Sequence, residues 1–209
     1  MKIRTYPYGL LGGNCYLCTN DLETEGVLID PIAPPDVVLK GVNKHLKICY
    51  ILITHCHFDH MLSYKDWQAL ANIPSAAMAE ETEGLLSPSV NLNEMFYREQ
   101  ISYGAPEIQL EDNQILTFGN HTIKVIATPG HTVGSCCYLI DDALFSGDTV
   151  FASGNYGRFD FPTGDASALF ASIKKLCALD DHITVYPGHG ESTTIGNENR
   201  TNPFVTRLI

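Results

Sequence analysis

The sequence that decides the fold is THCHFDH, residues 54–60, in which four side chains of the types that bind metals occur within six positions. It follows KICYILI at 47–53, an apolar run rich in β-branched residues, which predicts a strand buried on both faces. In an extended segment, side chains two positions apart point the same way, as we expect for His55 and His57. The turn that follows directs Asp59 and His60 toward a neighbouring point. The motif therefore predicts two adjacent metal sites beyond the end of a buried strand.

Three later turns carry the same residue types, each directly after a predicted strand: His131 in PGHT, Asp148 in SGDT and His189 in PGHG. Neutral imidazole and carboxylate suit zinc and similar divalent ions, and no thiolate is required. We expect the ligands to converge on a pair of metals about 3.5–4 Å apart. The remaining histidines lack such a context and are interpreted as scaffold residues: His45, His121 and His182.

Composition narrows the class of protein. The 209 residues are expected to form one domain, 1–209, with a full core. A net charge of −11 with 13 scattered basic residues argues against a nucleic-acid partner. The seven cysteines show no repeated spacing and are expected to be reduced, and the Cys15–Cys18 pair is interpreted as buried apolar side chains. With no membrane-length apolar run and no apolar leader, we expect a cytoplasmic protein that acts on a small molecule and not at a membrane. The sequence does not determine the oligomeric state.

The remaining pattern predicts strands and helices in similar numbers, hence a layered α/β or α+β domain with helices outside. The segment 88–108 shows neither the helical period of 3.6 residues nor the two-residue alternation of a strand, and it is predicted to be loop-rich. The expected strands lie near 2–7, 14–19, 26–30, 47–53, 75–79, 114–117, 121–127, 135–140, 143–146 and 183–186, and the expected helices near 36–45, 60–72, 80–86 and from Asp165 onward.

These motifs resemble those of the metallo-β-lactamase superfamily, and most of all its glyoxalase II (hydroxyacylglutathione hydrolase) branch. The resemblance also includes GNCYL at 13–17, VLIDP at 27–31 and YPGH at 186–189. It implies an α/β fold, a four-layer αββα sandwich with the metals at one edge. It further implies one metal held by His55, His57 and His131, a second held by Asp59, His60 and His189, and Asp148 as the bridge.

The resemblance also suggests roles for residues around the ligands. Asp30 is either an acceptor for a ligand imidazole or a turn residue that ends its strand. Arg158 either meets a substrate carboxylate or pairs with Asp160. Aspartate at 148, where exported zinc enzymes that cleave lactams often carry cysteine, argues against β-lactamase activity. The sequence stops soon after Asn202, so the helical C-terminal region of full-length glyoxalase II is expected to be missing or much shortened.

The hypothesis for function is a hydrolase in which a hydroxide held between two divalent cations attacks a carbonyl, with Asp59 orienting it. Zinc is the first expectation, with iron or manganese as alternatives. Thioesters such as S-lactoylglutathione fit because thiolate leaves readily and binds zinc. Two alternatives stay open: a persulfide dioxygenase with one iron on His55, His131 and Asp148, and a metal-binding module without turnover. The aromatic segment 88–108 either covers the metal edge and contacts substrate or is a packing loop or dimer contact.

Overall fold

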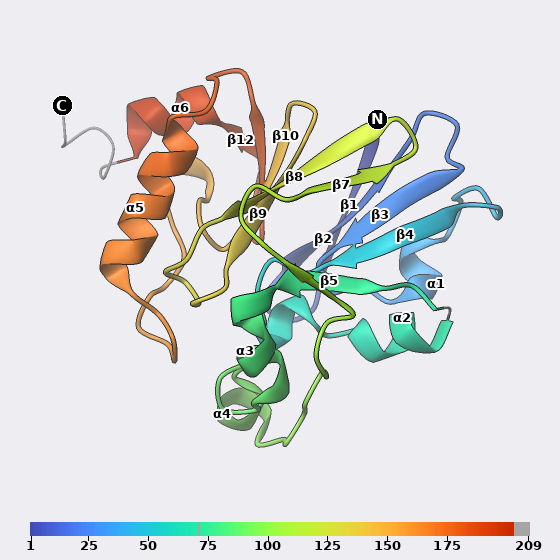
Figure 1. Cartoon of the computed structure of the whole chain (residues 1–209), viewed down its shortest axis with the longest axis horizontal. Coiled ribbons are helices and arrows are strands. Elements are labelled where there is room, and N and C mark those ends of the chain that lie inside the picture. Colours follow the sequence, from blue (N-terminus) through green and yellow to red (C-terminus); the bar gives the residue numbers. More distant parts are fainter. Residues whose placement is uncertain (71, 203–209) are drawn as a thin grey trace.

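The computed structural model describes residues 1–70 and 72–202. Two six-stranded sheets dominate it (Figure 1). The first sheet runs in chain order and is antiparallel as far as β3 and parallel beyond it. Its strands are β1 (Lys2–Tyr8), β2 (Gly13–Thr19), β3 (Glu25–Ile29), β4 (Lys47–Leu52), β5 (Ser75–Met78) and β6 (Ile108–Leu110).

The second sheet is antiparallel except for one parallel pair, β10 with β11. Its order is β12-β11-β10-β9-β8-β7. Its strands are β7 (Ile115–Phe118), β8 (His121–Ala127), β9 (Cys136–Ile140), β10 (Ala143–Gly147), β11 (Thr184–Pro187) and β12 (Thr193–Thr194).

Helices cover the outer faces of both sheets, as Figure 1 shows for α1 and α2 on one side and α5 and α6 on the other. On the side of the first sheet lie α1 (Pro35–Val38), α2 (Tyr64–Leu70), α3 (Thr82–Leu86) and α4 (Asn93–Tyr97). On the other lie α5 (Ala166–Cys177), which begins where the Asp165 side chain accepts a hydrogen bond from Ala168 N at 2.8 Å, and α6 (Ile195–Thr201). Three short 3₁₀ turns occur at η1 (Phe58–His60), η2 (Ala79–Glu81) and η3 (Ala152–Gly154).

The side chains of β4 show why four layers form. Leu52 points into the central core between the sheets, which it shares with Val125 and Phe145 of the second sheet. Ile51 points the other way, into a second cluster with Trp67 of α2. Both faces of β4 are therefore dry at its carboxyl end, where Ile51 and Leu52 are fully buried, whereas Lys47 at its start is exposed and residues 48–50 are half-buried. Each fully buried side chain of this size contributes roughly 1.5–3 kcal/mol. A third cluster packs α5 on the second sheet. The expected αββα sandwich is confirmed.

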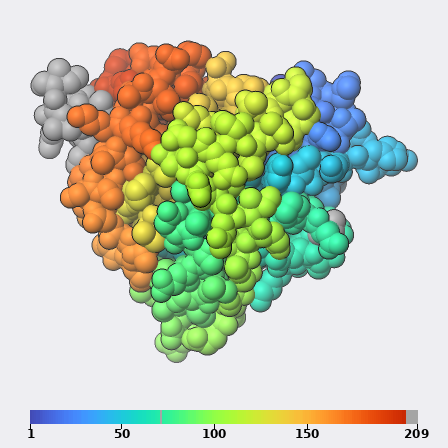
Figure 2. Space-filling model, in the orientation of Figure 1, coloured from blue at the N-terminus to red at the C-terminus, as the bar shows by residue number. Residues whose placement is uncertain are grey.

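Figure 2 shows one face of this molecule, on which the yellow-green segment with β6 and β7 lies between the orange segment with α5 and the cyan segment with β4. This segment is where the chain passes from one sheet to the other. No helix in the described ranges, 1–70 and 72–202, is both long and apolar enough to cross a membrane.

Several element boundaries differ from expectation. The helix expected over 36–45 is wrong, since α1 ends at Val38 and Gly41 has a φ of +74°, outside helical conformation. The helix expected over 60–72 begins only at Tyr64, because the metal motif occupies a 3₁₀ turn, and α2 is described as far as Leu70. The segment 88–108 was expected to be irregular but contains α4. The short elements β6, β12 and α6 were not expected.

Candidate metal centre

The predicted ligands all follow strand ends that meet at one edge of the sandwich. His55, His57, Asp59 and His60 come after β4 of the first sheet, whereas His131, Asp148 and His189 come after β8, β10 and β11 of the second. Parallel strands present their carboxyl ends at the same edge, which explains why the turns after β10 and β11 are neighbours. An isolated bridge from Gly13 to His189 joins the two sheets at this edge.

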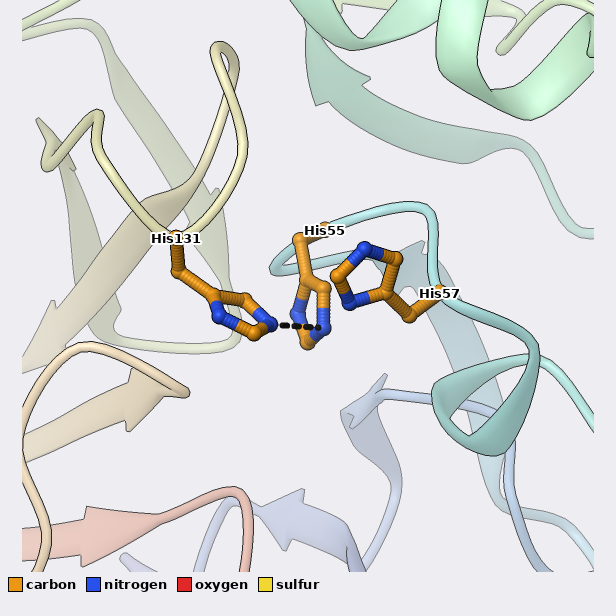
Figure 3. Close-up of side chains that lie close together, drawn as sticks. All are labelled: His55, His57 and His131. Atoms are coloured by element: carbon orange, nitrogen blue, oxygen red, sulfur yellow. Dashed lines mark hydrogen bonds between the residues drawn. The ribbon is translucent and has the colours of Figure 1, made fainter. Parts of the chain in front are cut away.

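The first trio consists of His55, His57 and His131, all buried (Figure 3). Their ring centroids lie 4.6–4.8 Å apart. His55 Nε2 and His131 Nε2 approach to 3.2 Å, the contact dashed in Figure 3. Figure 3 shows the first two rings on the turn after β4 and the third on a loop opposite, all directed to one point.

The second trio consists of Asp59, His60 and His189. His189 Nε2 lies 3.3 Å from His60 Nε2 and 3.2 Å from Asp59 Oδ2. Asp148 stands between the trios: its Oδ1 is 3.2 Å from His60 Nε2, and its Oδ2 is 3.6 Å from His131 Nε2. The seven side chains proposed from the sequence are thus brought together.

Four of the five imidazoles are fixed from behind, through Nδ1. Those of His131 and His189 donate to the carbonyl oxygens of Arg158 and Leu11, at 2.6 and 3.1 Å. The other two imidazoles donate to side chains. His60 Nδ1 donates to Asp30 Oδ2 at 2.7 Å, and His55 Nδ1 donates to the Thr54 hydroxyl at 3.1 Å. This hydroxyl in turn donates its proton to Asp30. Asp30 therefore does accept from a ligand imidazole.

This anchoring decides which ring nitrogens carry lone pairs. A neutral imidazole that donates through Nδ1 has its lone pair on Nε2, so the Nε2–Nε2 contacts at 3.2 and 3.3 Å place lone pair against lone pair. Such contacts repel unless a proton or a cation lies between them. The tautomers set by these acceptors are those of metal-ligating histidines.

Two further observations show that the residues fit a pair of cations. His57 Nε2 is buried and has no hydrogen-bond partner among the described residues, a costly arrangement unless a ligand meets it. Gly188 leaves room for the ligands, because a Cβ there would lie 2.2 Å from Asp148 Oδ1 and 2.7 Å from His60 Cε1. Nitrogen and carboxylate donors in this number suit zinc, iron or manganese.

The electrostatics also favour positive charge at the centre of the cluster. Burial lowers the pKa of His57 to about 3, and burial together with neighbouring imidazoles lowers that of His55, so both rings are neutral. Burial acts in the same direction on His60, but the carboxylates of Asp148 and Asp30 outweigh it and raise the pKa of His60 well above its usual value. The cluster attracts a proton where a cation is absent.

Other residues of the site carry no signal in the motif. Thr54 links Asp30 to His55, and its position directly before the motif is the only hint in the sequence. Glu81 is buried and accepts hydrogen bonds at 2.8 Å from the N–H of Cys56, between the first two ligands, and from that of Gly134, beyond His131. A carboxylate this far along the chain gives no local clue to that role.

A pocket of about 390 Å³ opens onto the cluster. Apart from the ligands, its lining is mainly aromatic, including Phe58, Phe96 and Phe161. Arg158 also lines it, but its guanidinium binds Asp160 through two hydrogen bonds of 2.8 and 2.7 Å, and its role toward substrate stays a prediction. Leu92 and Phe96, which lies on α4, both line the pocket, so the 88–108 segment does reach the metal edge. Tyr103 instead is buried against Tyr64.

Comparison with known proteins agrees with this geometry. The sequence pattern of the metallo-β-lactamase superfamily matches residues 8–189. The chain is 30% identical to hydroxyacylglutathione hydrolase GloC of Haemophilus influenzae, over 98% of each chain. Among solved structures, the BLEG-1 B3 metallo-β-lactamase superposes with a TM-score of 0.89 at 33% identity, covering 98% of this chain and 100% of that one. TTHA1623 in a di-iron-bound form superposes with a TM-score of 0.81 at 31% identity, covering 96% and 99%.

Proposed function

This chain belongs to the metallo-β-lactamase superfamily, and on that basis we propose that it is a two-metal hydrolase of small-molecule thioesters, of which S-lactoylglutathione is the first example to test. The observation that carries the proposal is the paired arrangement of inward-facing Nε2 lone pairs on either side of Asp148. The similarity to a hydroxyacylglutathione hydrolase supports the thioester.

The proposed ligands are His55, His57 and His131 for one cation and Asp59, His60 and His189 for the other, with Asp148 shared. When bound, two such cations polarise a carbonyl oxygen and lower the pKa of water to about 7. We propose zinc, with iron as the first alternative because the related TTHA1623 was crystallised in a di-iron-bound form, and with manganese as a further one.

The chain's own residues supply positioning and a dry site. Asp59 lines the pocket. Burial acts to raise its pKa, but the hydrogen bond with His189 and the charge of His60 outweigh burial and lower it. Asp59 is therefore an ionised acceptor that can hold the proton of an attacking water in a fixed direction. A substrate that covers the aromatic lining displaces water from the pocket, which strengthens the electrostatic interactions inside it.

A dioxygenase with a single iron, on His55, His131 and Asp148, is the competing function. The second trio favours the hydrolase, since it supplies a further set of donors, two of them anchored imidazoles, that a single iron on the first three residues leaves unused. A relative described as a β-lactamase covers nearly the whole chain at 33% identity, so Asp148 by itself is a weak argument against lactam cleavage, and β-lactams belong among the test compounds.

The test is hydrolysis of S-lactoylglutathione, simple thioesters and a β-lactam by zinc-loaded protein, with metal content measured in parallel. We expect two metals per chain and thioester cleavage, and a fall of about 100-fold or more in the Asp59→Ala variant. Asp66→Ala, which removes an exposed carboxylate of α2, is the control and should retain activity. One iron per chain with oxygen consumption and no hydrolysis would establish the dioxygenase instead, and stable metal binding without turnover would establish a non-catalytic module.

A further inference from the structure

Three aromatic rings from separate segments form a continuous surface beside the metal ligands. Phe58 follows β4, Phe96 lies on α4, and Phe161 lies in the loop before α5. Ring centroids are 5.1 Å apart for Phe58 and Phe96 and 6.3 Å apart for Phe96 and Phe161. Phe161 in turn lies 5.7 Å from the ring of His57. We call these three phenylalanines the aromatic wall; it runs from the ligands to the mouth of the pocket.

The wall is not fully covered by the protein itself. Phe58 is buried, at 4% exposure, but Phe96 at the outer end is 50% exposed. An exposed aromatic ring that lines a concave pocket retains apolar area that a ligand can remove from water. At about 390 Å³ the pocket has the size of a small-molecule site and holds more than a two- or three-carbon acyl group.

The charges around the wall disfavour an anionic group in the same place. Among the described residues that line the pocket, Arg158 is the one side chain with a permanent positive charge. Asp160 binds its guanidinium through two hydrogen bonds, and the guanidinium carbon lies 4.3 Å from the centroid of Phe161. The charge is thus already balanced, and the cation serves to hold the ring.

We infer that the substrate carries an aromatic or similarly large apolar group next to the scissile carbonyl, on its acyl or its thiol side, and that the aromatic wall binds this group. The inference rests on the proposed thioester hydrolysis and adds a substrate class to it. Phe96 is the residue that determines specificity, because its exposed face closes on the ring of the substrate.

The experiment compares thioesters that differ only in a phenyl group. S-acetyl-N-acetylcysteamine is the reference for S-phenylacetyl-N-acetylcysteamine, which adds the ring on the acyl side, and S-methyl thioacetate is the reference for S-benzyl thioacetate, which adds it on the thiol side. With zinc-loaded protein, we expect at least one ring to raise kcat/KM by about tenfold or more. In Phe96→Ala the ratio of the ring compound to the reference should fall toward one.

Phe159→Ala is the matched control, because this partly exposed phenylalanine packs on Phe170 and does not line the pocket. It should keep the ratio of the parent protein. The inference is overturned when neither ring raises kcat/KM, or when Phe96→Ala and Phe159→Ala change the ratio equally. In either case the thioesterase stands as long as the reference is cleaved.

A binding measurement separates the inference from the proposed function. If no thioester is cleaved, the function is wrong, and the wall is judged by calorimetry with non-hydrolysable ketone analogues, in which CH₂ replaces sulfur, bearing a methyl or a benzyl group. We expect the benzyl analogue to bind about tenfold or more tightly, with Phe96→Ala abolishing the difference. Equal binding of the two analogues would overturn the inference.

Discussion

Replacing Asp30 by asparagine tests how far the ligands depend on their anchors. Asp30 is 2% exposed and accepts three hydrogen bonds of 2.7–2.8 Å, from the Thr54 N–H, the Thr54 hydroxyl and His60 Nδ1. Its φ is +50°, a left-handed conformation that asparagine tolerates, so Asp30→Asn keeps the backbone. The amide oxygen can still accept from the Thr54 N–H, but the amide nitrogen then takes the place of the oxygen that accepts from the Thr54 hydroxyl and from His60 Nδ1.

The consequence falls on His60. An amide N–H facing Nδ1–H is a contact between two donors, so the ring must move its proton to Nε2, where the lone pair for the metal belongs. One hydrogen bond to a charged group is worth about 1.5–3 kcal/mol, which corresponds to a weakening of metal binding by about 10- to 100-fold. We expect this loss in the site of Asp59, His60 and His189 and a smaller loss in the other.

Competition with a chromophoric chelator measures both dissociation constants, and thermal melting confirms the fold. The matched control is Asp141→Asn. Asp141 also has a left-handed φ, +52°, and also accepts from a histidine Nδ1, that of His121 at 2.8 Å, but it lies on the β9–β10 turn away from the metal centre. Unchanged affinity in Asp30→Asn, or equal losses in the two variants, would show that the anchor does not act through the imidazole.

Three other predictions concern the same cluster. Gly188→Ala should abolish tight metal binding in a titration, because its Cβ would lie 2.2 Å from Asp148 Oδ1, whereas Gly190→Ala, with open space around it, should cost only about 1–2 kcal/mol of backbone strain. A metal present at 1,000 times its Kd adds about 4 kcal/mol to the free energy of unfolding, so its removal by a chelator should lower the Tm of a chain of this size by about 8–16 °C. An unchanged Tm would contradict metal binding by the folded state. Glu81→Ala leaves two backbone N–H groups without their acceptor and should lower the free energy of unfolding by about 2–6 kcal/mol in denaturant titrations, while Glu80→Ala at an exposed position should change it by less than about 0.5 kcal/mol.

The sequence predicts the long strands and the clustering of the candidate ligands well because both depend on local patterns. The run before His55 is apolar at successive positions because both faces of β4 are covered at its carboxyl end, and the candidate ligands lie in turns that follow strands, where their residue types can be recognised. The helix predicted over 36–45 does not form beyond Val38, because Gly41 adopts a positive φ of +74° despite the helical spacing of the apolar residues. The three-residue strand β6 is stabilised by its pairing with β5, a contact that no local sequence pattern reveals.

The parts of the site that the sequence does not reveal act through distant contacts. The carbonyl oxygens of Leu11 and Arg158 accept hydrogen bonds from the imidazoles of His189 and His131. Because every residue has a carbonyl oxygen, no side-chain pattern identifies these two positions in the sequence. Glu81 joins two loops, at Cys56 and Gly134, that lie 25 and 53 residues from it along the chain. The pairing of Arg158 with Asp160 is one of the two alternatives that the sequence predicts, because the residues are two positions apart, and the structure contains this ion pair.

The order of the ligands along the chain also limits when a cation can be captured during protein synthesis. The first four donors leave the ribosome together, within residues 55–60, but their partners on the second sheet follow over more than a hundred residues, and His189 comes last. A nascent chain therefore offers the donors proposed for the first cation once β10 and Asp148 have emerged, and the full set for both cations only after β11. Tight loading has to wait until both halves of the sandwich have docked, which makes metal uptake a late event in the life of the polypeptide.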